Sequence, residues 1–593
     1  MTGYSAPLAD MRFVLEHVVD LPALSSLPGF GHAGPDVVDG VLEESGRFFA
    51  QEFGPLDRVG DLQHSRRHED GTVTTPDGFV AAYRRSVEAG WAGVPFPEEY
   101  GGGGFPWLVA VAMQEMLTAA NMGFSLCPLL TQGAIDMLVH YGSEEQRELY
   151  LPRMVTGEWT GTMNLTEPQA GSDLGALTTR AVPADDGTWR ITGQKIFITY
   201  GEHDLTPNIV HLVLARTPDA PPGTRGISCF IVPKVLVEED GSLGRRNAVE
   251  CVSIESKMGI NASPTCVMAY DGAVGYLVGE VHQGMRYMFK MMNNARLSVG
   301  VSGLSLGERA YQEAVAYARE RRQGRAPGTP RGESSPIVEH PDVRRMLLTM
   351  RAQIEALRCL TYLNAESIDL AERHPDPGVR AARGELADLL TPISKAWGTD
   401  LGVELTSLAL QVHGGIGYIE ETGVAQHYRD IRIAPIYEGT NGIQAIDLVG
   451  RKLPMRGGGV IADHLAAVDA TAAELSAAED EALSTIGKRL ADAHACLRST
   501  TDWLLANGSA DPTSALAGAT PYLRMCGIVT GGWLLARSAR AARRLLDAGE
   551  GDPDLLAQKL VTARFYAEQL LPVAAGLAPS VTAGPADLRA ATF

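Results

Sequence analysis

The chain is 593 residues long, more than one hydrophobic core usually serves, so we expect several domains. Its 51 Lys+Arg against 71 Asp+Glu leave a net charge of −20, which disfavours non-specific binding to nucleic acid or to an anionic membrane surface. The seven cysteines are scattered and form no C-x-x-C pair, which argues against a disulfide framework or a zinc site and for a reducing compartment.

The first 40 residues are interrupted by prolines and are interpreted as an N-terminal extension. They contain no basic region followed by an apolar core, and we identify no apolar run of membrane-spanning length, so we expect a soluble, cytoplasmic protein without membrane contact. Residues 29–34 satisfy G-x-G-x-x-G, but a dinucleotide site needs a strand before this motif and a helix after it. Because Pro28 and Pro35 bracket the motif, we interpret it as a glycine-rich loop.

Two regions of different periodicity follow. Residues 41–161 have helical periodicity, and we expect helices near 77–89, 108–120 and 144–154. Residues 162–284 contain short β-branched and apolar runs bounded by Gly, Pro, Asn or Asp. These runs predict strands at 189–199, 208–215, 226–233 and 247–253.

Residues 285–455 return to helical periodicity. A long helix is expected from Met285 to Arg322, with Gly300, Gly303 and Gly307 on one face where a neighbouring helix could approach closely. A helix pair is expected over 342–372 and 379–413. Helices, then consecutive strands, then helices is an α+β order.

Residues 456–593 are expected to form an appended helical domain. Residues 456–459 are interpreted as a linker, and the Ala- and Leu-rich segments 460–475, 482–507, 520–548 and 554–571 could form a four-helix bundle. From residue 456 onward there are 12 Lys+Arg and 15 Asp+Glu.

The segment 436–444 attracts attention because it places a carboxylate in a turn. Pro435 opens the turn, and Thr440 is a plausible N-cap for a helix over 444–449. Neighbouring Tyr437 and Ile436 would keep water from Glu438, which raises the pKa of a carboxyl group toward the range of a general base. The alternative interpretation is an ordinary surface Glu in a helix-entry loop.

Four segments occur together in an order typical of one family. They are LTEPQAGSD at 165–173, GQKIFIT at 193–199, QVHGGIGY at 411–418 and YEGT at 437–440. With them, residues from about 89 to about 453 resemble the acyl-CoA dehydrogenases, flavoproteins with an N-terminal helical domain, a middle β-barrel-like domain and a C-terminal helical bundle. The appended helices resemble a long branch of that family, which is typically dimeric.

The resemblance implies that FAD accepts a hydride and that Glu438 is the catalytic base that removes the α-proton of an acyl-CoA thioester. In some relatives a catalytic Glu immediately precedes Arg296, but Ala295 occupies that position here. His413 has no catalytic role in the family and is interpreted as structural. The residues implied at the FAD site are Thr166, Gly171, Ser172, Phe197, Thr199, Arg321, Gln411, Gly415, Thr440 and Asn441. The residues implied at the substrate are Ser172, Asn293, Arg296, Tyr437, Glu438 and Gly439; no metal is expected.

Three details of the resemblance affect the expected assembly and flavin contacts. Phe197 stands where many relatives have a Trp packed on the flavin ring, and Thr199 corresponds to a hydroxyl near flavin N5. Arg321 corresponds to an arginine that reaches the FAD pyrophosphate across a subunit boundary, and Gln411 and Gly415 to the loop at its adenosine end. Shared FAD sites imply at least a homodimer.

The resemblance leaves the substrate and the electron acceptor open. Members of the long branch act on 3-methylmercaptopropionyl-CoA or on fatty acyl-CoA, and an electron-transfer flavoprotein is the expected acceptor. One alternative is an acyl-CoA oxidase that passes electrons to oxygen. Another is a DNA-binding flavoprotein of the same fold, suggested by the basic stripe of Arg537, Arg540, Arg543 and Arg544 but opposed by the acidic balance of the appended domain.

Overall fold

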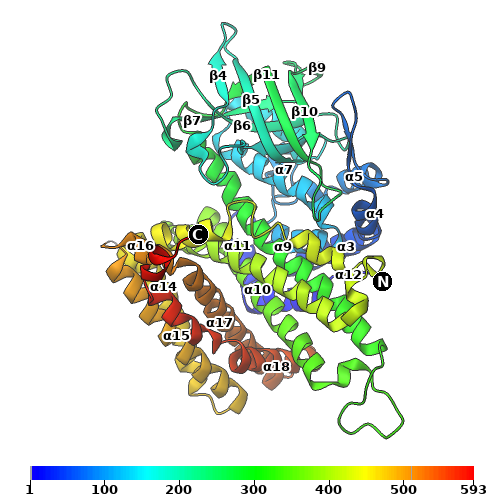
Figure 1. The fold of residues 1–593 in the computed structure, drawn as a ribbon, viewed down its shortest axis with the longest axis vertical. Helices are drawn as coiled ribbons and strands as arrows, with labels where there is room; N and C mark the ends of the chain where they lie inside the picture. The colour runs from blue at the N-terminus through cyan, green and yellow to red at the C-terminus, as the bar shows by residue number, and fades with distance from the viewer. Residues whose placement is uncertain (1–2, 509) are drawn as a thin grey trace. The chain divides into compact units, whose positions relative to one another are not determined.

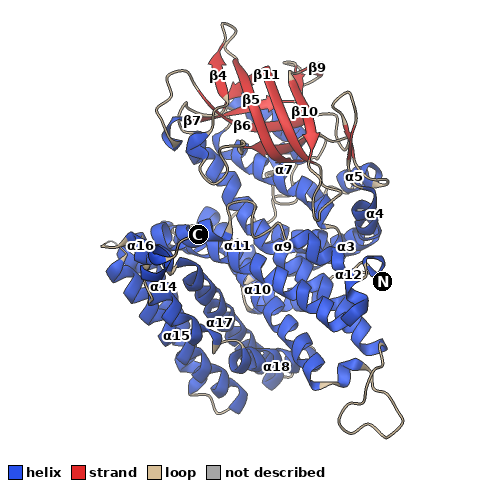
Figure 2. Ribbon diagram, in the orientation of Figure 1, coloured by secondary structure: helices blue, strands red, loops and turns tan. Residues whose placement is uncertain are grey.

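The structure is a computed structural model that describes residues 3–508 and 510–593, so the first two residues of the chain lie outside it. The chain divides into two compact units, each described here by itself (Figures 1 and 2). The sheet unit comprises residues 45–105 and 116–295, and the bundle unit comprises residues 1–44, 106–115 and 296–593. The expected α+β class is confirmed, and all described strands belong to the sheet unit.

The sheet unit is built on a seven-stranded sheet that closes on itself. Its strands are β3 (Thr160–Asn164), β4 (Arg180–Pro183), β5 (Trp189–Thr199), β6 (Ile209–Arg216), β7 (Ile227–Pro233), β10 (Val249–Ile254) and β11 (Thr265–Leu277). The sheet order is β10-β11-β5-β4-β6-β3, and β7 pairs with both β11 and β6. The β7 pairings close a ring of β11, β5, β4, β6 and β7, which confirms the barrel-like expectation; Ile191, Phe230 and Tyr270 are among its buried core residues.

The sequence analysis missed β11, the longest of these strands. Asp271-Gly272 in its middle is a dipeptide typical of turns, so the sequence there does not indicate a continuous strand. In the structure these two residues form an irregularity instead: Gly272 has a φ of 67°, and the pairing with β5 shifts register between Asp271 and Ala273. A β-bulge therefore carries the strand past a sequence that otherwise predicts its end.

Helices of the sheet unit cover the barrel and connect its parts. They include α4 (Gly54–Gln63), α5 (Phe79–Glu88), α7 (Met122–Tyr141) and α8 (Glu144–Val155). Helix α7 packs on β3; in Figure 2 the helix lies below the sheet. It is the one helix among the described residues that is long and apolar enough to cross a membrane, so the expectation that no run reaches that length was wrong. In the structure 78% of its most apolar window is buried inside the protein.

The bundle unit is organised by three long helices, α9 (Gly284–Glu320, in this unit from Arg296), α10 (Pro341–Arg373) and α11 (Pro377–His413). The expected close approach along α9 is confirmed. A Cβ added at Gly300 would lie 2.5 Å from the carbonyl oxygen of Ser394, and one at Gly303 would collide with the backbone of Gly398. The backbones of α9 and α11 therefore touch where only glycine fits.

The appended helices belong to the same unit. They are α14 (Gly459–Ser476), α15 (Glu481–Asn507), α16 (Pro512–Ala517), α17 (Ala519–Ala548), α18 (Pro553–Gln569), α19 (Val573–Thr582) and α20 (Ala586–Ala590). The expected linker at 456–459 is an ordered turn. Arg456 has a φ of 48°, and its guanidinium pairs with Glu385 at 2.8 Å and Asp463 at 2.6 Å, so charge holds the turn in place.

The N-terminal segment forms α1 (Leu8–His17), α2 (Leu21–Ser25) and the start of α3 (Pro35–Glu52). Residues 29–34, the G-x-G-x-x-G match, lie in turns between α2 and α3, and the described segment before them is helical. The interpretation as a glycine-rich loop is confirmed, because the strand that a dinucleotide site requires does not precede the motif.

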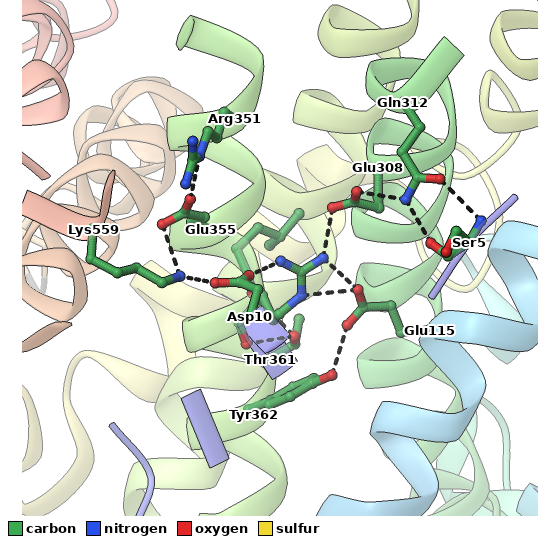
Figure 3. A network of polar contacts seen from close by, with 12 residues as sticks. Ser5, Asp10, Glu115, Glu308, Gln312, Arg351, Glu355, Thr361, Tyr362 and Lys559 are labelled. Carbon is green, nitrogen blue, oxygen red and sulfur yellow. Dashed lines mark hydrogen bonds and ion pairs between the residues drawn. The ribbon is translucent and has the colours of Figure 1, made fainter. Parts of the chain in front are cut away.

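A buried cluster of charges joins the first helix, the bundle and the appended helices (Figure 3). Arg358 of α10 pairs with Glu115 at 2.7 Å, with Glu308 at 2.8 Å and with Asp10 of α1. Lys559 of α18 pairs with the same Asp10 and, at 3.1 Å, with Glu355 of α10. Opposite charges meet throughout the cluster, which is the condition under which buried ions are tolerated.

We expect Lys559→Met to destabilise the protein by about 3 kcal/mol, because it removes one cation and leaves the facing carboxylates buried with less compensation. Lys488→Met, on an exposed position of α15, is the matched control and should change stability little. Thermal unfolding midpoints followed by circular dichroism measure both variants. Equal midpoints for the two variants would show that the cluster does not hold the appended helices.

Candidate active site

Glu438 lies in a tight turn between α12 (Val424–Ile431) and α13 (Asn441–Asp447). Its φ is 56°, in the left-handed region that residues other than Gly rarely adopt. Gly439 follows with a φ of 83°. Thr440 caps α13 by accepting a hydrogen bond from the Ile443 N–H at 3.2 Å, as expected, although the helix begins three residues earlier than predicted. Backbone strain of this kind persists where the surrounding structure fixes it.

Gln444, which the sequence analysis did not identify, fixes the turn from inside. Its buried amide group donates to the carbonyl oxygens of Glu438 at 3.3 Å and Gly439 at 3.2 Å. The Asn441 N–H donates to the carbonyl oxygen of Pro435 at 3.0 Å. The Glu438 N–H has no acceptor in the described part of the chain.

The Glu438 carboxylate is partly shielded from water and carries no hydrogen bond or ion pair within the described residues. Burial raises the pKa of Glu438 to about 7, while the positive charges of Arg296 and then Lys395 act in the opposite direction. The structure therefore agrees with the prediction that neighbouring side chains keep water from Glu438 and raise the pKa of its carboxyl group. A carboxyl group with a pKa near neutrality can gain and lose a proton at physiological pH.

Arg296 approaches the turn from α9. The residue is 5% exposed, and its guanidinium lies 3.9 Å from the carboxylate of Asp447 on α13. Arg451 binds the same carboxylate at 2.7 Å. Burial lowers the pKa of Arg296, and the carboxylates of Asp447 and Glu438 oppose that shift. The structure therefore brings Arg296 together with Tyr437, Glu438 and Gly439, as the substrate-site prediction requires.

Lys395 approaches the same turn from α11 and was missed by the sequence analysis. It is fully buried, and its Nζ donates to Asn441 Oδ1 at 2.8 Å. The Asn441 amide group in turn donates to Asp400 at 2.7 Å, to Thr399 Oγ1 at 3.0 Å and to the Ala396 carbonyl oxygen at 3.1 Å. Asn441 thus binds the start of α13 to α11, a structural task beside its predicted contact with FAD.

The residues predicted to face the flavin from the sheet unit lie on β5 and on the loop before it. Phe197 has a φ of 59°, and 58% of its side chain is exposed, which is unusual for a large apolar residue on a barrel strand. Thr199 is two residues away, and Ser172 is exposed in the loop. An exposed aromatic face beside hydroxyl groups fits the binding of a flat, polar-edged ring such as the isoalloxazine of FAD.

The loop at 165–173 is held by a buried ion pair that the sequence analysis did not identify. Glu167 accepts hydrogen bonds from Lys195 Nζ at 2.9 Å, from the Thr178 N–H at 2.7 Å and from the Thr179 N–H at 3.0 Å. The Thr166 carbonyl oxygen accepts from the Ile196 N–H at 2.9 Å. These contacts join the loop to β5.

Gly171 lies in that loop, and a Cβ added there would meet no protein atom. Protein packing therefore does not require glycine at this position. Asn293 is half-buried on the part of α9 that belongs to the sheet unit. The ligand contacts predicted for both residues stay predictions.

The remaining predicted flavin residues lie on the surface of the bundle unit. Arg321 is exposed beyond the end of α9, and Gln411 and Gly415 are exposed at the end of α11. His413 between them is buried, stacks on Tyr317 with ring centroids 4.6 Å apart and binds the Ala409 carbonyl oxygen at 2.8 Å. These contacts agree with its interpretation as structural.

Four family models match successive parts of the chain. They are described as the acyl-CoA dehydrogenase N-terminal domain (residues 48–158), middle domain (162–273) and C-terminal domain (282–453), and the acetyl-CoA dehydrogenase C-terminal-like domain (464–592). The chain belongs to the acyl-CoA dehydrogenase family. It is an oxidoreductase that uses FAD to dehydrogenate an acyl-CoA thioester.

Individual relatives are similar over almost the whole chain. The 3-methylmercaptopropionyl-CoA dehydrogenase of Ruegeria pomeroyi is 49% identical over 568 residues, which cover 96% of each chain. A broad-specificity linear acyl-CoA dehydrogenase of Mycobacterium tuberculosis is 35% identical and covers 97% of this chain and 96% of its own. The crystal structure of a Bacillus anthracis acyl-CoA dehydrogenase complexed with FAD shares the fold, with a TM-score of 0.72 at 21% identity, covering 92% of this chain and 88% of that one.

Three of the four arginines in the basic stripe on α17 are bound to other groups of the protein, while Arg544 is exposed. Arg540 pairs with Glu474 at 2.6 Å, and Arg543 pairs with Asp480 at 2.8 Å. Arg537 is half-buried and donates to the carbonyl oxygen of Val18 at 2.5 Å. Duplex binding requires several cations to neutralise phosphates together, so these pairings argue against a DNA-binding surface here.

We expect Gly439→Ala to reduce the rate of flavin reduction by acyl-CoA at least about tenfold, because a 1 Å displacement of a catalytic group can cost about a hundredfold in rate. The new Cβ would lie 2.8 Å from Gln444 Nε2 at a backbone φ of 83°. Gly442→Ala is the matched control, since its Cβ would meet only Thr440 Oγ1 at 3.8 Å inside α13. Stopped-flow absorbance measures both; similar rates would show that the turn geometry is not critical.

Proposed function

We propose that Glu438 is the base that removes the proton from the carbon next to the thioester carbonyl. The proposal is supported by one observation: the Glu438 carboxylate is partly shielded from water on a strained turn near two buried cations, and it has no hydrogen bond or ion pair in the described part of the chain. A base bound to Arg296 or Lys395 in a tight ion pair would be too weak. At longer range these cations favour the ionised form without occupying its oxygens.

The turn also provides a donor for the charge that develops on the substrate. The free N–H of Glu438 can donate to the thioester oxygen, and stabilising an enolate-like oxygen is worth about 3 kcal/mol per donor. Gln444 fixes the backbone that carries this N–H by donating to two carbonyl oxygens of the same turn. When bound, FAD supplies the acceptor for the hydride, which no side chain can accept.

FAD binding is assigned to both units. Phe197 packs against the flavin ring, with Thr199, Thr166 and Ser172 supplying polar contacts. Arg321, Gln411 and Gly415 bind the FAD of a second subunit, so the enzyme is a homodimer. The exposure of these three residues supports this assignment, as do the exposed apolar side chains of Ile416, Tyr418 and Ile419 beside Gly415.

The proposed substrate is 3-methylmercaptopropionyl-CoA. The support is the 49% identity to the Ruegeria pomeroyi enzyme, against 35% to the Mycobacterium tuberculosis enzyme named for linear acyl-CoA. An electron-transfer flavoprotein takes the electrons, as the family resemblance implies, and the enzyme works in the cytoplasm.

The assignment of the base is tested by Glu438→Gln. We expect this variant to keep FAD, because the amide has nearly the same shape, and to lose flavin reduction by acyl-CoA about a hundredfold or more, since general bases contribute about 10²–10⁴. Anaerobic bleaching of the flavin absorbance measures the loss. Bleaching at the wild-type rate would exclude Glu438 as the base.

A panel of thioesters tests the substrate. We expect 3-methylmercaptopropionyl-CoA to reduce the flavin faster than butyryl-CoA and octanoyl-CoA, each at saturating concentration. Hydrogen peroxide is measured in the same reactions, and an amount equal to the product would instead identify an oxidase. Faster reduction by octanoyl-CoA would place the enzyme with the linear acyl-CoA dehydrogenases.

A further inference from the structure

Lys395 has no role in the reaction as proposed above, yet it is a fully buried cation beside the catalytic turn. Among the described residues its Nζ contacts one side chain, through the 2.8 Å bond to Asn441 Oδ1, which is a neutral acceptor. Burying an ammonium group without a directly bound carboxylate is costly. Because burying Lys395 costs stability, we expect this residue to have a role in function.

The packing of α9 on α11 fixes where this ammonium group lies. Gly300 touches the backbone of Ser394 and Lys395, so the start of the Lys395 side chain is set by a glycine contact between the helices. The far end is set by Asn441, which itself is bound by Thr399, Ala396 and Asp400. The ammonium group is therefore held at one position, against Asn441, which lies three residues after Glu438 in the sequence.

We propose that Lys395 is a positioning residue for Glu438, holding the catalytic turn through Asn441 and supplying, together with Arg296, the positive charge that faces the Glu438 carboxylate. This inference rests on the proposed role of Glu438. In this role Lys395 does more than form a hydrogen bond. Its charge sets the pH above which Glu438 is ionised.

The electrostatics agree with this placement. Burial lowers the pKa of Lys395 to about 7, and Glu438 is the strongest of the charges that oppose the shift, followed by Asp400. Both groups titrate in the same range and influence each other, so their protons are lost in two steps that belong to the pair. Between the two steps both groups are charged, and Glu438 can accept a proton in this state and at higher pH.

Other charged groups face this pair from every packed element. They are Arg296 on α9, Asp400 on α11, Asp447 on α13 and Arg451 just after it, with Glu404 and Arg524 acting on Asp400. Asp447 and Arg451 bind each other at 2.7 Å, so their charges largely cancel. Lys395 and Arg296 remain as the cations that act on Glu438.

The sign of the effect follows from the role of the base. Glu438 must be ionised to react, so flavin reduction rises with pH through the pKa of Glu438. Removing the positive charge of Lys395 disfavours the carboxylate and moves that midpoint to higher pH. A shift of one pH unit makes the rate about tenfold lower on the acidic side of the midpoint and leaves the alkaline plateau near its original value.

The test compares Lys395→Met, Lys395→Gln and Thr399→Val as purified, FAD-loaded full-length proteins. Gln keeps an N–H donor toward Asn441 without the charge, and it serves as the second variant if Met does not yield folded protein. Thr399→Val removes a neutral hydrogen bond to the same Asn441. The rate of anaerobic flavin reduction by saturating 3-methylmercaptopropionyl-CoA or octanoyl-CoA, whichever reduces the wild type faster, is measured from pH 5.5 to 9.5.

We expect both Lys395 variants to shift the midpoint upward by about one unit, and Thr399→Val to leave the midpoint unchanged. A wild-type midpoint in both Lys395 variants would overturn the proposal, even if the plateau falls, because Lys395 would then act through packing alone. An equal shift in Thr399→Val would also overturn it. Failure of the proposed function gives a different result: wild-type flavin that no acyl-CoA reduces, or Glu438→Gln reduced at the wild-type rate.

Discussion

The contact between α9 and α11 is the constraint on which the catalytic turn depends. Because Gly300 and Gly303 have no side chains, the two helices meet backbone to backbone. Arg296 lies one helical turn before Gly300 on α9, and Lys395 follows the residue that Gly300 touches on α11. A larger residue at either glycine would separate the helices and move both cations away from Glu438. The reactivity of the carboxylate is thus a consequence of how closely two helices pack.

Buried charges serve two different purposes in the bundle unit. In the cluster around Arg358 each charged group meets an opposite one within ion-pairing distance, and the result is attachment of one helix to another. Around Glu438 the two cations are close enough to attract the carboxylate electrostatically, but each is bound to another residue. Arg296 faces Asp447, and Lys395 donates a hydrogen bond to Asn441. Leaving the carboxylate without a partner costs stability, and this cost is what keeps it available to a substrate.

Much of the fold could be predicted because residues typical of helix ends mark where its helices begin. Pro341, Pro377 and Pro553 each stand at the first position of a helix, and the glycines of α9 correctly indicated close packing. The catalytic turn was predictable for the same local reasons, a proline before it and a capping threonine after it. By contrast, β11 was missed because its bulge residues resemble a turn. Helix α7 lies in the region expected to be helical, but it was not identified as a separate helix, because it is apolar on nearly every side and lacks the one-sided periodicity of a surface helix.

The site residues that sequence reasoning missed are those whose partners are distant along the chain. Lys395 meets Asn441 from 46 residues away, on a different helix, and nothing near Lys395 in the sequence indicates that contact. The Lys195–Glu167 pair joins a strand to a loop 28 residues earlier. Gln444 is only six residues after Glu438. The sequence does not show that its side-chain amide points toward the catalytic turn, so nothing distinguishes it from other glutamines on short helices. Direction and distance come only from the packed structure.

The pairing of Asp10 with Lys559 has a consequence for how the chain is made. Asp10 has two cationic partners, Arg358 and Lys559, and ribosomal synthesis makes Arg358 well before Lys559. The charge cluster around Asp10 is therefore complete only after α18 has been made. A chain that ends before α18 would leave the carboxylates of Asp10 and Glu355 with one cation fewer. The pairing therefore favours chains that contain α18 over chains that end before it.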